Sequence, residues 1–247
     1  MKMKFKQSGF SLTEVMMAAG ILAIGLMLVA TMFPLGIHLS SVAAERTMAA
    51  VVADSAFAKI QLYGIDVVNG GWWSWPPKHE QMTYFEKISF VDSIDANEFA
   101  YPTTDSDPNT ASQFYWSAAC RKVNDDPCDT SVQVTVFVGR KKAPNQTFCY
   151  GNYDRPVFIT LDTLSDNTTI TIVIQAFAIF VNPPTTIADS RTGRLYRVIE
   201  RNGLELTLDR PLDEDTVGGT KITVMPPPDS GGSRNADIDV FQRIIRF

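Results

Sequence analysis

The sequence contains few of the residues that build catalytic or metal sites: two histidines and three cysteines in 247 residues. Three cysteines exclude a disulfide-dense miniprotein. A histidine-based catalytic group in the carboxyl-terminal region would have to use His79, and no Gly-x-Ser-x-Gly elbow, phosphate-binding loop or dinucleotide fingerprint accompanies it. The formal net charge of -5 argues against nucleic acid as a partner. The sequence therefore predicts neither an enzyme nor a cofactor.

Charge is also missing from a long amino-terminal stretch. No Asp, Glu, Lys or Arg occurs between Glu14 and Glu45, and residues 15–33 are all apolar, Gly or Thr. At about 1.5 Å per residue, a helix of this length roughly matches a hydrocarbon layer about 30 Å thick. We therefore expect a transmembrane segment over about residues 15–37.

The charges that flank this segment predict its orientation. Lys2, Lys4 and Lys6 precede it, and the next Lys or Arg is Arg46. The positive-inside rule then places the amino terminus in the cytoplasm and the bulk of the chain outside. A cleaved secretory signal is the alternative, but its apolar region is shorter and gives no role to a carboxylate such as Glu14.

The residues at the start of the apolar run form a specific motif. Gly9-Phe10-Ser11-Leu12-Thr13-Glu14-Val15, behind a short lysine-containing leader, resembles the signal of type IV prepilins and type II secretion pseudopilins, most closely the minor ones. The resemblance implies that prepilin peptidase cuts between Gly9 and Phe10 and methylates the new Phe10 amine. It also implies that Glu14 docks on the Phe10 amine of a neighbouring subunit.

The chemistry of the residues agrees with this reading. Cutting after Gly9 removes the three leader lysines and creates one cationic amine at Phe10, one helical turn from Glu14. Glycine has no side chain, so a peptidase can approach the backbone closely. A buried carboxylate without a partner is costly, whereas a paired one fixes register.

The resemblance further implies a structural subunit of a type IV pilus or a type II secretion pseudopilus. Such a subunit crosses the inner membrane once and then enters the filament. Its partners are other pilin or pseudopilin subunits, prepilin peptidase, the inner-membrane assembly platform and membrane lipid. Two rivals remain: an uncleaved inner-membrane-anchored binding module, and a membrane-tethered extracytoplasmic enzyme.

The expected fold is α+β and pilin-like, with a leader (1–9), a long helix (10–64) and an extracytoplasmic β-rich head (65–247). Apolar residues recur at three-to-four spacing between Val42 and Tyr63, and Gly64 is a suitable carboxyl-terminal cap. Pro34 falls inside the helix, where we favour a kink over a helix end.

Period-two patterns in the second half predict strands around Val134–Val138 and Ile170–Ile174. Residues 196–201 and 204–208 flank Asn202-Gly203, which predicts a hairpin. Residues 221–225 and 238–247 are further expected strands. We expect these strands to form an antiparallel sheet.

The remaining features allow two readings each. The three cysteines permit one disulfide, either Cys120–Cys128 or Cys128–Cys149, and we take Cys120 and Cys128 as the candidate pair. The tryptophans Trp72, Trp73 and Trp75 either contact a partner or fold back on the core, and we favour the core. A calcium site is conceivable at Asp125, Asp126 and Asp129, but we favour a solvated loop.

Six basic residues could contact phosphate, but we favour solvated surface positions for all of them. They are Arg140, Lys141, Lys142, Arg194, Arg197 and Arg201.

Overall fold

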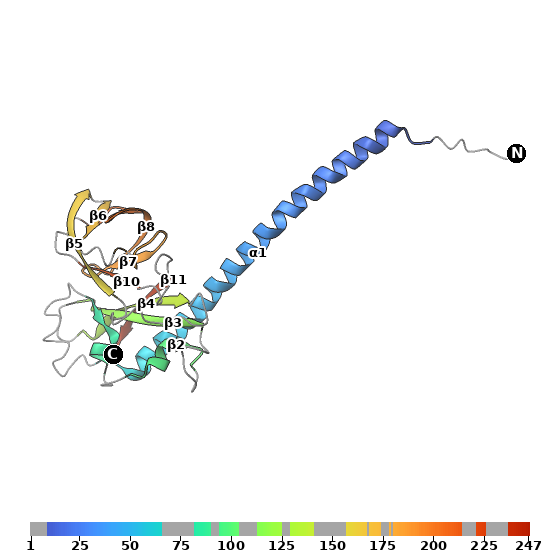
Figure 1. Cartoon of the computed structure of the whole chain (residues 1–247). Helices are drawn as coiled ribbons and strands as arrows, with labels where there is room; N and C mark the ends of the chain where they lie inside the picture. The colour runs from blue at the N-terminus through green and yellow to red at the C-terminus, as the bar shows by residue number, and fades with distance from the viewer. Residues whose placement is uncertain are drawn as a thin grey trace. The chain divides into compact units, whose positions relative to one another are not determined.

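A computed structural model describes residues 9–65, 82–89, 94–103, 113–124, 129–140, 157–166, 168–173, 178, 180–213, 221–225 and 237–247. The chain divides into two compact units, residues 1–45 and 46–247. One long helix followed by antiparallel β-sheets makes up the fold, which confirms the expected α+β, pilin-like layout (Figure 1).

The long helix α1 runs over Leu12–Tyr63 without interruption. Its first free amides are satisfied by Ser11, whose carbonyl oxygen accepts hydrogen bonds from the backbone N–H groups of Glu14 and Val15 at 3.0 and 3.2 Å. The helix continues through Pro34, so the reading in which this proline ends the helix is wrong.

Gly64 ends α1. Its backbone φ is 69°, and its N–H donates to the carbonyl oxygen of Ile60 at 3.0 Å. This left-handed conformation costs glycine little, and the hydrogen bond satisfies one of the last free carbonyls. The cap predicted from the sequence is therefore confirmed.

An antiparallel five-stranded sheet follows, in which β1, β3, β4 and β11 are consecutive neighbours and β2 also pairs with β3. Two short helical turns, α3 (Phe85–Ile88) and η1 (Ala96–Phe99), precede β3. The strands are β1 (Thr83–Tyr84), β2 (Ala100–Tyr101), β3 (Phe114–Lys122), β4 (Ser131–Arg140) and β11 (Asp237–Arg246).

The other six strands close into an antiparallel barrel in the order β10-β5-β6-β9-β8-β7. The sequence predicted strands and a hairpin in this region but not a separate barrel. Gly203 has a φ of 63°, as the Asn202-Gly203 turn between β8 and β9 requires. The strands are β5 (Val157–Asp166), β6 (Thr169–Ile172), β7 (Thr186–Asp189), β8 (Leu195–Asn202), β9 (Glu205–Leu208) and β10 (Lys221–Val224).

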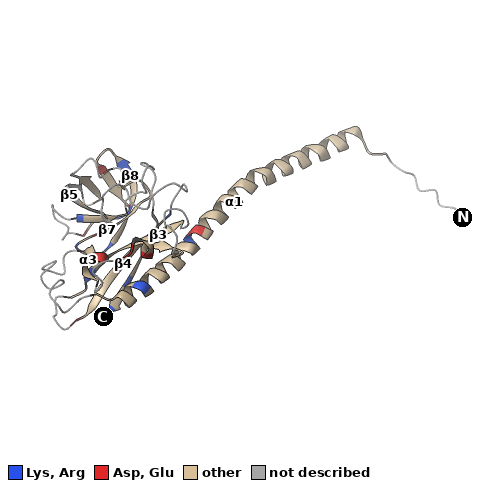
Figure 2. Ribbon diagram, turned by 60° about the horizontal axis from the view of Figure 1, so that its bottom comes forward, with Lys and Arg blue, Asp and Glu red and all other residues tan. Residues whose placement is uncertain are grey.

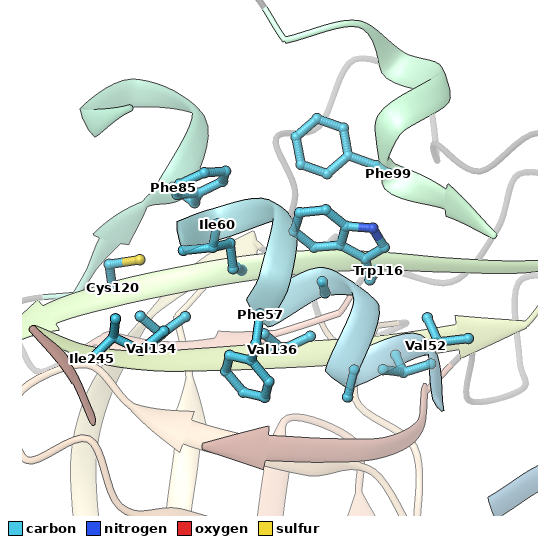
Figure 3. Packing of buried hydrophobic residues seen from close by; sticks show 14 of the residues in the cluster. Val52, Phe57, Ile60, Phe85, Phe99, Trp116, Cys120, Val134, Val136 and Ile245 are labelled. Atoms are coloured by element: carbon cyan, nitrogen blue, oxygen red, sulfur yellow. The ribbon is translucent and has the colours of Figure 1, made fainter. Parts of the chain in front are cut away.

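One face of the five-stranded sheet is covered by the last turns of α1. Phe57 and Ile60 of α1 belong to one buried cluster with Trp116 of β3 and with Val134 and Val136 of β4 (Figure 3). Alternate residues of β4 enter this cluster because side chains alternate between the two faces of a strand. The amphipathic second half of α1 is therefore the layer that builds the head's core.

The opposite face of the same sheet packs against the barrel. Tyr115, Phe137 and Val240 of the sheet cluster there with Ala188 of β7 and Met225, which follows β10. The sheet is thus the middle layer of residues 46–247, with α1 on one side and the barrel on the other.

Candidate functional site

The Gly9–Phe10 peptide bond lies in an accessible segment just before α1. Neither residue is part of a helix or strand, the Phe10 side chain is 83% exposed, and no atom lies within 4 Å of where a Cβ on Gly9 would be. A peptidase needs such open backbone outside a helix, because helical hydrogen bonds would hold the bond away from catalytic groups. The structure therefore leaves the predicted cleavage position open to attack.

Glu14 lies in the first turn of α1 and is exposed. Its backbone N–H is bound to Ser11, and the Ser11 and Thr13 hydroxyl oxygens lie 2.6 Å apart. A carboxylate in the first turn is favoured by the helix dipole by about 0.3–1 kcal/mol. The first turn is therefore ordered by its own residues, and no side chain among the described residues pairs with the Glu14 carboxylate.

An apolar surface follows Glu14 on all sides of the helix. Every residue from 9 to 41 is exposed, and residues 15–33 carry no charge. Figure 2 shows this stretch of α1 in tan, whereas blue and red ribbon marks its later turns. Burying one large apolar side chain stabilises by about 1.5–3 kcal/mol, so this surface strongly favours a lipid or protein environment over water.

Length and composition make α1 a membrane-span candidate, and none of its apolar window is buried within the chain. Its polar groups fit that environment. Thr31 is the only hydroxyl residue among residues 15–33, and its Oγ1 donates to the carbonyl oxygen of Leu28 at 2.8 Å. This helix is consistent with a membrane-anchored protein.

The comparison with protein families agrees with the geometry. The family model for the prokaryotic N-terminal methylation motif matches residues 4–30. No curated protein and no solved structure matches the chain significantly. The chain therefore carries the type IV prepilin-like signature over residues 4–30, which include the first part of α1. This motif indicates a structural subunit rather than an enzyme.

The cysteines predicted to pair are only partly within the described residues. Cys120 is fully buried on the α1 side of β3, and the structure has it as a free cysteine. Burial raises the pKa of its thiol well above the usual range. Cys128 and Cys149 lie outside the described residues, so the Cys120–Cys128 disulfide stays a prediction.

Several other predicted features also lie outside the described residues, namely the three tryptophans Trp72, Trp73 and Trp75, His79, Asp125, Asp126, and the basic pair Lys141 and Lys142. Asp129 is described, and it accepts hydrogen bonds from the Ser131 backbone N–H at 2.8 Å and from Asn124 Nδ2 at 2.6 Å. These hydrogen bonds, Ser131 first, lower the pKa of the Asp129 carboxyl. Among the described residues no group of three possible metal ligands is present.

Two of the arginines considered for phosphate binding have internal roles. Arg201 Nη1 donates to the carbonyl oxygen of Val181 and to Asn182 Oδ1, at 3.3 and 2.7 Å. Arg194 forms an ion pair with Asp213. These contacts hold loops on the barrel. Arg194 is exposed, as the sequence predicted, whereas Arg201 is half-buried against these loops.

An ion pair that the sequence did not reveal holds residues 94–103 against α1. Lys59 Nζ lies 2.7 Å from Glu98 Oε2 and also donates to the Glu98 carbonyl oxygen at 2.8 Å. Trp116 Nε1 donates to the same carbonyl oxygen at 3.0 Å. Lys59 and Glu98 are 39 residues apart, so no local pattern could have paired them. This cluster fixes the end of α1 on the head.

Proposed function

We propose that this protein is a minor pilin or pseudopilin, a structural subunit of a type IV pilus or a type II secretion pseudopilus. One observation carries the proposal: a methylation motif at residues 4–30 overlaps the start of an apolar helix, of which every residue up to 41 is exposed. A subunit that first resides in lipid and then packs helix against helix needs such a surface in both places. The head then remains outside the membrane.

In this proposal prepilin peptidase hydrolyses the peptide bond between Gly9 and Phe10. Water supplies the oxygen for the new Gly9 carboxylate, and the α-amine of Phe10 is released. This amine then attacks the methyl group of a sulfonium methyl donor and gives up one proton, and the donor leaves as a thioether. The methylated amine stays cationic. Entering the apolar filament core, it pairs with the Glu14 carboxylate of a neighbouring subunit, because either charge alone would be costly there.

The proposed location follows from the charges that flank the helix. The leader lies in the cytoplasm, α1 crosses the inner membrane, and the head is extracytoplasmic. The partners are the prepilin peptidase, the assembly platform of the inner membrane, membrane lipid and other pilin or pseudopilin subunits.

Intact-mass spectrometry of the native protein tests the processing step. We expect a mature chain that lacks residues 1–9 and carries one added methyl group on Phe10. A chain that retains its leader would contradict the proposal and favour the uncleaved, membrane-anchored binding module instead.

A charge-removal variant tests the docking step. Glu14→Ala should still lose its leader, since the scissile bond is intact, but it should not co-purify with filaments. Glu45→Ala is the matched control, because it removes one negative charge from the same helix outside the apolar stretch. Equal incorporation of Glu14→Ala and the wild type would contradict the pairing.

A further inference from the structure

The barrel is inserted between two neighbouring strands of the sheet. β4 and β11 pair antiparallel, with Gly139 opposite Asp237, although all of the barrel's strands lie between them in the sequence. The chain therefore leaves the sheet at the end of β4 and returns at the adjoining end of β11. The five-stranded sheet is complete in its backbone pairing without any strand of the barrel.

The barrel is equally complete in itself. Its first and last strands, β5 and β10, pair with each other, so Val157 lies opposite Val224. The two ends of the inserted segment are thus neighbours, and the barrel's ring of strand pairs closes without a strand from the sheet. Closure leaves no barrel edge that must be completed by the rest of the head.

Each part also has its own core. The barrel encloses a cluster that includes Ile170, Ile187 and Leu206, all fully buried and all contributed by the inserted segment. The cluster between α1 and the sheet draws on none of these strands. A separate hydrophobic core is the property that allows a segment to fold as a unit.

The two parts share a buried apolar cluster, in which Tyr115 and Phe137 of the sheet pack with Ala188 and Met225 of the inserted segment. A polar contact at the β7–β8 turn adds to this interface. The carbonyl oxygen of Gly193 in this turn accepts hydrogen bonds from Gln242 Nε2 at 2.6 Å and from Gln133 Nε2 at 3.3 Å. Arg121 Nη1 donates to the carbonyl oxygen of Arg191 in the same turn, at 2.6 Å. These side chains come from β3, β4 and β11, so three strands of the sheet provide hydrogen-bond donors to one turn of the barrel.

The barrel and α1 use opposite faces of the sheet. β4 shows this directly, since Val136 packs on the α1 side and the adjacent Phe137 packs on the barrel side. Within residues 46–247, the last turns of α1 and the barrel therefore cover different faces of the sheet. The barrel thus takes no part in the packing of these last turns of α1 on the sheet.

We infer that the barrel is an inserted display module: it is not needed for folding of the α1–sheet part or for its assembly, and it faces outward on the assembled filament. The second half of this inference rests on the proposed function. The first half rests only on the topology and the separate cores.

Hydrogen exchange on the full chain in detergent tests the folding half. Ile170→Asp places an unpaired charge in the barrel core, and Val134→Asp is the matched control in the core between α1 and the sheet. Ile170→Asp should abolish amide protection in β5–β10 and leave that of β4 and β11 at the wild-type level. Loss of protection in β4 and β11 as well would overturn the inference, whatever the protein's function.

Filament incorporation of the same variants tests the assembly half. Ile170→Asp should be processed and recovered in filaments as well as the wild type, whereas Val134→Asp should not be recovered. Loss of incorporation in Ile170→Asp with β4 and β11 still protected would overturn the inference. Wild-type protein that never enters filaments would instead contradict the proposed function and leave the hydrogen-exchange result standing.

Thiol labelling tests the outward position. Ile199 is 59% exposed on β8, and Met16 is 69% exposed on α1. Ile199→Cys should react with a maleimide equally fast in filaments and in dispersed subunits, whereas Met16→Cys should be protected on assembly. Wild-type chain gives the background from the native cysteines. Protection of Ile199→Cys in filaments would overturn the outward position of the barrel.

Discussion

Arg243 on the last strand lies over the ring of Phe57 on α1, with its guanidinium carbon 4.6 Å from the ring centroid. The same guanidinium forms an ion pair with Asp54, one turn earlier on the helix. Arg243 and Phe57 are far apart in the sequence, so this contact joins the last strand to the amino-terminal helix. β11 therefore pairs with β4 in the sheet and also holds α1 against the sheet.

This pair predicts two unequal losses of stability. Phe57→Ala should lower the free energy of unfolding by about 3–5 kcal/mol, because it empties a buried site against β4. Arg243→Gln should cost about 0.5–1 kcal/mol, since the ion pair is exposed and the cation–π contact is partly solvated. Denaturant unfolding of the full chain in detergent measures both. Equal losses would show that the guanidinium, rather than the ring's burial, holds the helix.

The β7–β8 turn, which contacts the sheet, requires glycine at position 193. Gly193 has a φ of 72°, and a Cβ there would lie 2.4 Å from Gln133 Oε1. Gly193→Ala should therefore destabilise the chain by about 1–3 kcal/mol, from backbone strain and from the displaced glutamine. Gln133→Ser relieves only the clash, so the double variant should recover part of this loss. A Gly193→Ala chain with wild-type stability would contradict the close packing of Gly193 against Gln133.

Local signals explain which parts of the fold could be predicted from the sequence. One long amino-terminal helix, its cap at Gly64 and the turn at Gly203 each depend on a few neighbouring residues, and the structure confirms all three. The cleavage motif is local in the same sense. The candidate site at Gly9, Phe10 and Glu14 could therefore be predicted almost entirely from the sequence.

Long-range pairing explains what could not be predicted. β3 has no alternating pattern, since Tyr115 and Trp116 are both buried, one under the barrel and the other under α1. A strand covered on both faces does not give the period-two signal of a half-exposed one. Closure of the barrel depends on Val157 meeting Val224, and no residue near either position indicates the other.

Tyr63 predicts a loss of stability at alkaline pH. Burial first, and then the negative charge of Glu98 and a hydrogen bond with its side chain, raise the pKa of the Tyr63 hydroxyl above 10. The folded chain thus holds this proton more tightly than the unfolded chain does. The contribution of the protonated Tyr63 hydroxyl to the free energy of unfolding is complete below pH 10. It is lost as the pH rises through the pKa of Tyr63 in the folded chain. Tyr63→Phe should show a weaker fall in stability between pH 9 and 11, measured as the difference in unfolding midpoint from the wild type. Identical pH profiles would contradict the coupling to Glu98.

Cys120 gives a prediction that separates the structure from the disulfide expected from the sequence. The side chain is fully buried beside β4, and its thiol pKa is raised by burial, so little nucleophilic thiolate forms at pH 8. Iodoacetamide should therefore leave Cys120 unmodified in the folded chain and modify it once the chain is unfolded without a reductant. Peptide mapping by mass spectrometry locates the label. Rapid labelling of the folded chain would contradict the burial of this residue. If Cys120 reacts in the unfolded chain only after reduction, it forms a disulfide with Cys128 or another cysteine. The assignment of Cys120 as a free cysteine would then be wrong.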